Sequence, residues 1–121
     1  MKKAALVIGK QNSGKSTTLK EFSELVGERG KKKFSLNGKA GFIAYCSFEE
    51  YDYDPAVLIE GLAKDDYFYL AFACQGSQLQ EVLKALKKAS YAICEVRIER
   101  PQDGAEKAKE IFTFFNINVE K

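Results

Sequence analysis

The sequence predicts a three-layer α/β fold, in which helices cover both faces of a mostly parallel sheet of about five strands that includes a hairpin. Short apolar runs alternate along the chain with segments whose apolar residues recur at helical spacing. The runs at 4–8 and 67–74 are apolar throughout, as strands buried on both faces are. Asn37-Gly38 favours a tight hairpin turn, because both residues tolerate positive φ. The expected order is βαββαβαβα, in a single domain over residues 1–121.

The first half of the chain predicts a strand, a helix and a hairpin. The run at 4–8 is the first strand, and a helix is expected from Lys15 to about Val26, where Gly27 can end it. The apolar residues of this helix are Leu19, Phe22, Leu25 and Val26. Segments 33–36 and 40–47 are the expected paired strands of the hairpin. The second of them is apolar on both faces, so we expect it inside the sheet.

The second half predicts a further helix, then strand, helix, strand and helix. Asp54 before Pro55 favours a helix start, with an apolar face at Val57, Leu58 and Leu62. The run at 67–74 is the expected central strand, and a helix capped by Ser77 and Gln80 follows it with a stripe at Leu79, Val82, Leu83 and Leu86. Segment 91–98 alternates apolar residues with Glu95 and Arg97, which predicts a strand near an edge. The last helix is expected to be capped by Asp103 and Glu106 and to bury Ala108, Ile111, Phe112 and Phe115.

The most informative segment is 9–16, which reads G-x-x-x-x-G-K-S between the first predicted strand and the first helix. Gly9 and Gly14 allow backbone angles and close approaches that let successive N–H groups turn around a phosphate. Lys15 adds a positive charge, Ser16 offers a hydroxyl to Mg²⁺, and the start of the helix directs its positive end at the same oxygens. The alternative is a Gly-rich turn that only links strand to helix.

Residues 4–26 therefore resemble the phosphate-binding region of the P-loop NTPase superfamily. The resemblance implies binding of ATP or another nucleoside triphosphate with Mg²⁺, and it names no reaction. The residues expected to bind the nucleotide are Gly9, Asn12, Ser13, Gly14, Lys15, Ser16 and Thr17, with Ser16 at the metal. Lys15 is also expected to act in any catalysis.

A second acidic residue is harder to place. In the P-loop superfamily an Asp usually ends a neighbouring strand and holds Mg²⁺ through water, but the candidate strands here end in Ala73-Cys74-Gln75 and Cys46-Ser47. Glu49 and Glu50 follow a predicted strand end, where one of them could order a metal-bound water or take a proton. The alternative is a solvated loop in which Asp54 only caps its helix. No N-K-x-D or D-x-x-G sequence occurs, so the resemblance does not extend to small GTPases.

Two functions are favoured at this point, and a third, association with nucleic acid through the lysines of 29–39, is a weaker alternative. The first is slow NTP hydrolysis or kinase-like phosphoryl transfer, with Lys15, Glu49 and Glu50 as catalytic residues. The second is a non-catalytic nucleotide-binding sensor or partner module. Three other residues are weaker candidates for contacting the nucleotide or a water. A turn explains Gln75 equally well, a solvent-facing position explains Arg97, and Arg100 only follows the end of the last strand.

Composition narrows the partners. The net charge of +2 is too small to indicate nucleic acid, and the lysines near the hairpin are typical of a protected sheet edge. The chain has no histidine, which excludes histidine chemistry. Each of the three cysteines, Cys46, Cys74 and Cys94, lies in or at the end of an apolar run, which predicts buried, reduced thiols. Reduced thiols favour a cytoplasmic protein. No apolar run is long enough to cross a membrane. The expected partners are the nucleotide and an unidentified acceptor or protein.

Overall fold

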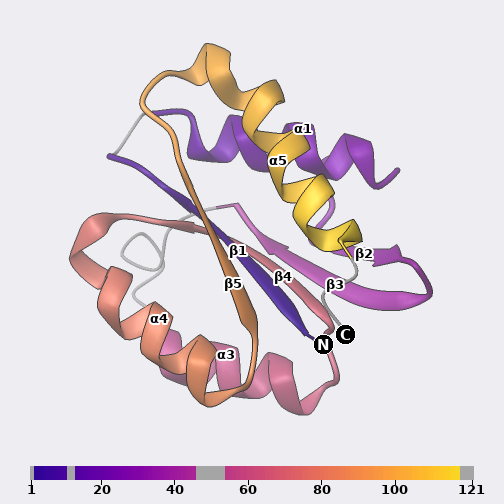
Figure 1. The fold of residues 1–121 in the computed structure, drawn as a ribbon, viewed down its shortest axis with the longest axis vertical. Coiled ribbons are helices and arrows are strands. Elements are labelled where there is room, and N and C mark those ends of the chain that lie inside the picture. The colour runs from indigo at the N-terminus through magenta and orange to yellow at the C-terminus, as the bar shows by residue number, and fades with distance from the viewer. Residues whose placement is uncertain (1, 11–12, 46–53, 118–121) are drawn as a thin grey trace.

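The computed structural model describes residues 2–10, 13–45 and 54–117. Its strands form one sheet in the order β2-β3-β4-β1-β5 (Figure 1). The strands are β1 (Lys3–Ile8), β2 (Lys33–Leu36), β3 (Lys39–Ala44), β4 (Tyr69–Cys74) and β5 (Ala92–Arg97). The helices are α1 (Lys15–Leu25), α3 (Pro55–Lys64), α4 (Leu79–Lys88) and α5 (Gly104–Asn116), with short 3₁₀ turns η1 (Gly76–Gln78) and η2 (Pro101–Asp103).

The pairing of the strands confirms the predicted mostly parallel sheet with one hairpin. Strand β1 pairs in parallel with both β4 and β5, and β3 pairs in parallel with β4. Strands β2 and β3 are antiparallel and are joined by Asn37 and Gly38, both at positive φ. The order of the elements within the described residues agrees with the βαββαβαβα prediction.

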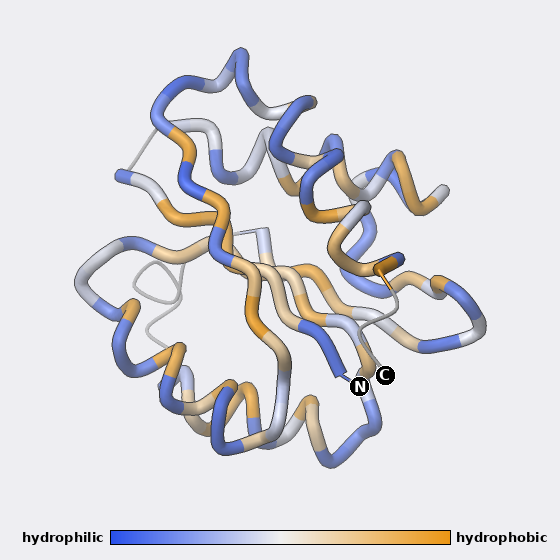
Figure 2. The backbone as a smooth tube through the Cα atoms, viewed as in Figure 1, coloured by the Kyte–Doolittle hydropathy of each residue, from blue (hydrophilic) through white to orange (hydrophobic). Residues whose placement is uncertain are grey.

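Two hydrophobic cores lie on the two faces of the sheet, which gives the three predicted layers (Figure 1). Helices α1 and α5 cover one face and helices α3 and α4 cover the other. Alternate residues of β1 enter the two cores, with Ala5 and Val7 on the first side and Ala4 and Leu6 on the second. Figure 2 shows the hydrophobic residues along the strands and the hydrophilic ones on the outer turns of the helices and the hairpin. Burial on both faces explains why β1 is an unbroken apolar run.

Several helix details differ from the prediction. Val57 is 68% exposed, and Ile59 supplies the buried contact of α3 together with Leu62, because the helix presents a different face than the spacing suggested. Leu25, expected inside, is 41% exposed at the last turn of α1.

The cysteines differ in burial. Cys94 is only half-buried at the edge of the sheet, whereas Cys74 is buried as predicted; Cys46 lies outside the described residues. Burial, followed by the charges of Glu110 and Glu95, raises the pKa of the Cys94 thiol.

The predicted caps are confirmed for one helix and wrong for two. The Asp54 carboxylate accepts a hydrogen bond from the Ala56 N–H at 3.0 Å, ahead of Pro55 in the first turn of α3. Ser77 lies inside η1, and α4 begins without a side-chain cap, because the 3₁₀ turn leads directly into the helix. Asp103 precedes α5 but does not cap it with its side chain. Its carboxylate pairs with Arg100 at 3.2 Å instead.

A buried lysine closes the end of the sheet opposite the predicted phosphate loop. The side chain of Lys3, 5% exposed, donates from Nζ to the carbonyls of Phe114 and Phe115 at 3.2 Å and also to that of Ile117. These carbonyls lie at the C-terminal end of α5, where the last carbonyls carry partial negative charge, and that of Phe114 also accepts from the Ile117 N–H at 3.3 Å. The ammonium therefore anchors the last helix to the first strand.

No helix of the described chain has the length and apolar character needed to cross a membrane.

Candidate phosphate-binding site

The predicted phosphate loop lies where the chain leaves the sheet in two directions. After β1 the chain enters α1 on one face, whereas after the neighbouring β4 it enters α4 on the opposite face (Figure 1). Loops that diverge from adjacent parallel strands leave a crevice at their carboxyl ends, and this is where open α/β sheets bind ligands. The Gly9 N–H donates to the Cys74 carbonyl at 3.2 Å, which holds the start of the loop beside the end of β4.

The loop ends at the exposed start of α1. Gly14 is the residue before the helix and has φ 103° and ψ 17°, a left-handed conformation that strains any residue with a side chain. The first helical hydrogen bond runs from the Thr18 N–H to the Gly14 carbonyl at 2.9 Å. The preceding N–H groups therefore have no acceptor within the helix, and the helix has neither a side-chain cap nor an acidic residue in its first turn. Such an end attracts anions.

Lys15 connects the two ends of the loop. Its Nζ donates to the Gly9 carbonyl at 2.9 Å and to the Lys10 carbonyl at 2.6 Å, and the residue is only 6% exposed. The ammonium of this first residue of α1 is thus held by two carbonyls at the opening of the loop. A positive charge, a positive helix end and backbone N–H groups converge in this part of the structure.

The two fixed glycines are required by contacts within the protein. A Cβ on Gly9 would lie 2.3 Å from Ser13 Oγ and 2.7 Å from the Ile98 carbonyl oxygen. A Cβ on Gly14 would lie 2.6 Å from Pro101 Cα, in η2. Both positions therefore need glycine for the loop to pack against the segment after β5. This packing requirement adds to the conformational reason that the sequence pattern suggested.

The other predicted ligands differ in exposure. Ser16 and Thr17 are exposed in the first turn of α1, so their hydroxyls are accessible. Ser13 is 7% exposed, and its buried Oγ has no hydrogen-bond partner within the described chain. A buried hydroxyl without a partner is costly, and a ligand atom at the loop could supply one. Asn12 lies outside the described residues.

A groove of about 390 Å³ adjoins the loop on the side of β5. Its charged lining residues are Lys10, Arg97 and Glu99. From the sequence, Arg97 was a weak candidate for contacting the nucleotide, and Glu99 had no predicted role. The signal needed was the pairing of β1 with β5, which places Ile8 opposite Arg97 and so brings residues 97–99 beside the start of the loop. Arg97 is exposed and pairs with Glu95 at 3.4 Å, as its alternation predicted.

The acidic residues proposed for catalysis are not located by the structure. Glu49 and Glu50 lie outside the described residues, and Asp54 is occupied at the start of α3. Gln75 follows β4 directly, next to the carbonyl that binds the Gly9 N–H. Among the described residues, no three His, Cys, Asp or Glu side chains gather as a metal site. Of the predicted loop residues, the structure brings Ser13 and Lys15 against Gly9, and Gly14 and Ser16 lie at the start of α1.

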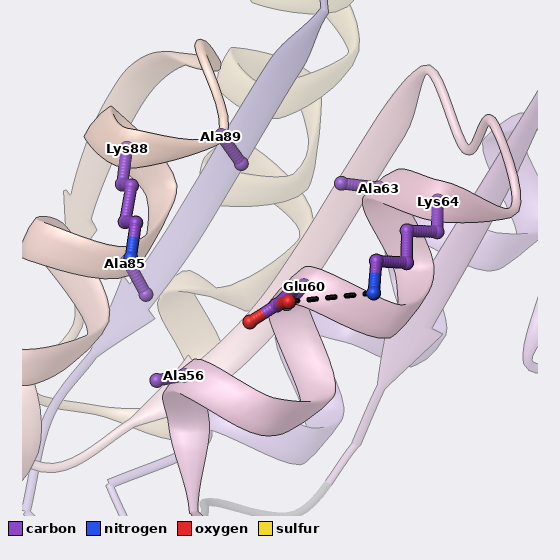
Figure 3. A pocket seen from close by; sticks show the side chains of 7 residues that line it. All are labelled: Ala56, Glu60, Ala63, Lys64, Ala85, Lys88 and Ala89. Atoms are coloured by element: carbon purple, nitrogen blue, oxygen red, sulfur yellow. Dashed lines mark ion pairs between the residues drawn. The ribbon is translucent and has the colours of Figure 1, made fainter.

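A second hollow, of about 360 Å³, lies between α3 and α4 (Figure 3). Its lining includes the small side chains of Ala56 and Ala63 in α3, of Ala85 in α4 and of Ala89 just after α4. Glu60 and Lys64 form an ion pair of 3.4 Å on one side, and Lys88 lies on the other helix (Figure 3). These helices cover the opposite face of the sheet from α1 and α5, so this hollow is separate from the loop.

Comparison with known proteins supports the fold alone. No family model and no curated protein matches the chain. A de novo designed protein described as having a PFK fold, solved by solution NMR, is similar in structure with a TM-score of 0.58. The similarity covers 98% of this chain and 95% of the designed one at 12% sequence identity. The α/β architecture is therefore shared, and an identity this low carries no functional inference.

Proposed function

We propose that this chain binds a nucleoside triphosphate, with ATP as the first candidate, together with Mg²⁺, through residues 9–17. The observation that supports this most directly is Lys15, which begins the uncapped helix α1 and whose ammonium is held by two carbonyls of the loop. A triphosphate brings several negative oxygens to one place, and this arrangement supplies a cation, a helix N-terminus and backbone N–H groups there.

The residues at the loop fit such a ligand. Gly14 and the first turn of α1 would bind phosphate oxygens through backbone N–H groups, and Lys15 would reach the outer phosphates. The exposed Ser16 hydroxyl is the proposed protein ligand of Mg²⁺, which would supply charge neutralisation at the phosphates when bound. Ser13 Oγ, which lacks a partner among the described atoms, is available for one further hydrogen bond.

Two activities follow from nucleotide binding. In the first, Glu49 and Glu50 position a water or an acceptor hydroxyl, and the protein is a slow NTPase or a kinase-like phosphotransferase. In the second, the protein is a sensor or partner module without significant turnover of its own. One observation favours the second: β4, whose Cys74 carbonyl accepts from the Gly9 N–H at the start of the loop, ends at Cys74 and is followed by Gln75, and so offers no carboxylate at that point.

Calorimetric titration tests nucleotide binding. The purified chain is titrated with ATP, GTP and ADP, each with and without Mg²⁺, followed by a turnover assay with the tightest ligand. We expect a triphosphate to bind and Mg²⁺ to strengthen its binding. Absence of heat with every nucleotide, together with no shift of the melting temperature, would refute the proposal.

The Ser16→Ala variant tests the metal ligand. Because the hydroxyl would contact the metal, its removal should reduce the gain in affinity that Mg²⁺ provides and change binding without Mg²⁺ much less. Ser35→Ala is the matched control, since Ser35 is an exposed hydroxyl on β2. An equal loss with and without Mg²⁺ in Ser16→Ala would show that the hydroxyl does not bind the metal.

A further inference from the structure

The two edges of the sheet are protected very differently. Strand β2 forms one edge, is only four residues long and carries Lys33, with Lys31, Lys32 and Lys39 close by in the chain. Short edge strands with lysines resist pairing with another chain. Strand β5 forms the other edge, is six residues long, and contains neither lysine nor proline. Its exposed charged side chains are those of one acid and one base, Glu95 and Arg97.

The hydrogen bonds of β5 show which of its backbone groups face away from the sheet. The Ala92 N–H donates to the Lys2 carbonyl at 2.8 Å, and the Ile98 N–H donates to the Ile8 carbonyl at 2.9 Å. In a parallel ladder every second residue bonds to the neighbouring strand, so the even-numbered residues of β5 face β1. The N–H and C=O groups of Ile93, Glu95 and Arg97 therefore point outward, where no described strand pairs with them.

We propose that a second copy of this chain pairs with β5, so that two β5 strands run antiparallel across a two-fold axis and the two sheets become continuous. In a two-fold pair the same strand pairs with itself, so the register is set by the residue at the axis. With Val96 at the axis, Glu95 of each copy lies opposite Arg97 of the other. Both residues have outward-pointing backbone groups, as the hydrogen-bonded pairs of an antiparallel ladder require.

The charges of Glu95 and Arg97 favour the register centred at Val96 over the neighbouring two-fold registers. With Glu95 at the axis, two glutamates would lie directly opposite each other, and with Arg97 at the axis, two arginines would. Like charges directly opposite in a sheet are destabilising, and opposite charges are stabilising. Among two-fold registers centred within the strand, the one centred at Val96 places both charged residues opposite a residue of opposite charge. Arg97 and Glu95 already approach to 3.4 Å within one copy, so two copies would form a network of four charges.

The interface is small, because it joins two strand edges, so a weak dimer is expected, with a Kd on the order of micromolar. Sedimentation equilibrium of the full chain, from about 1 to 500 µM, measures it. We expect the wild type to dimerise as concentration rises. Arg97→Glu places two acids opposite each other and Glu95→Arg places two bases, so each should weaken association at least tenfold. The double variant Glu95→Arg/Arg97→Glu exchanges the charges and should restore the dimer.

Three results would overturn the proposal. The first is a wild type that stays monomeric over the whole range. The second is association that neither single variant changes, which would place the interface elsewhere. The third is a double variant that folds normally, as judged by circular dichroism and melting temperature, but remains monomeric. Lys33→Glu on β2 is the matched control, and loss of the dimer in that variant alone would move the interface to the other edge of the sheet.

Discussion

Replacing Lys15 with alanine tests the loop in two ways, because this side chain has a structural role before any ligand binds. Its Nζ donates to two carbonyls, of Gly9 and Lys10, and the residue is 6% exposed. Hydrogen bonds from a charged donor contribute about 1.5 to 3 kcal/mol each, but the carbonyls that Lys15→Ala releases can turn to water, so we expect a total loss of about 1.5 to 3 kcal/mol. In a domain of this size, that lowers Tm by roughly 5 to 15 °C while the fold persists.

The same variant should bind triphosphate less tightly. Loss of one charge-assisted contact to phosphate corresponds to roughly a 10- to 150-fold increase in Kd, which calorimetry can measure below the lowered melting temperature. Lys20→Ala is the matched control, since Lys20 lies on the same helix and is exposed. If Lys15→Ala retains wild-type Tm, the two loop contacts do not stabilise the free protein. If it retains wild-type affinity, the nucleotide proposal is wrong.

Three further predictions follow from single contacts and residues. Lys3→Met keeps the length of the side chain but removes the charge that binds the end of α5, so chemical denaturation should show a loss of about 2 to 3 kcal/mol; an unchanged midpoint would contradict the anchoring role. Burial, aided by the charge of Asp66, raises the pKa of Tyr91 from 10.0 to about 12. The stability that this phenol contributes is therefore complete below pH 10 and is lost as the pH rises through 12. Tyr91→Phe removes the titrating group together with its hydrogen bond to the Tyr67 carbonyl. The unfolding free energy of this variant should decline less between pH 10 and 12 than that of the wild type. If the chain is an enzyme, replacing Glu49 and Glu50 with Gln should lower turnover by roughly 10²- to 10⁴-fold with a far smaller change in nucleotide affinity; normal turnover in the double variant would exclude both as the catalytic acids.

The sequence alone determined the fold class, the order of elements and the position of the loop. These depend on local signals that can be recognised in the order of residues alone. Strand β1, buried on both faces, is apolar throughout, Asn37-Gly38 forms the hairpin turn, and Asp54 caps α3. Each of these arises from the conformational preference or burial of a few neighbouring residues. The glycines and Lys15 of the loop were identified for the same reason, since their spacing in the chain is itself the pattern.

Only the tertiary structure decided what surrounds that loop. The sequence could not show that β5 lies beside β1, and without that pairing Glu99 and Pro101 have no relation to Gly9 and Gly14. It also assigned caps to Ser77 and Asp103 that a 3₁₀ turn and an ion pair with Arg100 replace. Helical spacing allows several faces to be buried, and strand order depends on which crossovers pass over which face of the sheet. Contacts between residues 90 positions apart are set by the packing of whole elements, which no local pattern encodes.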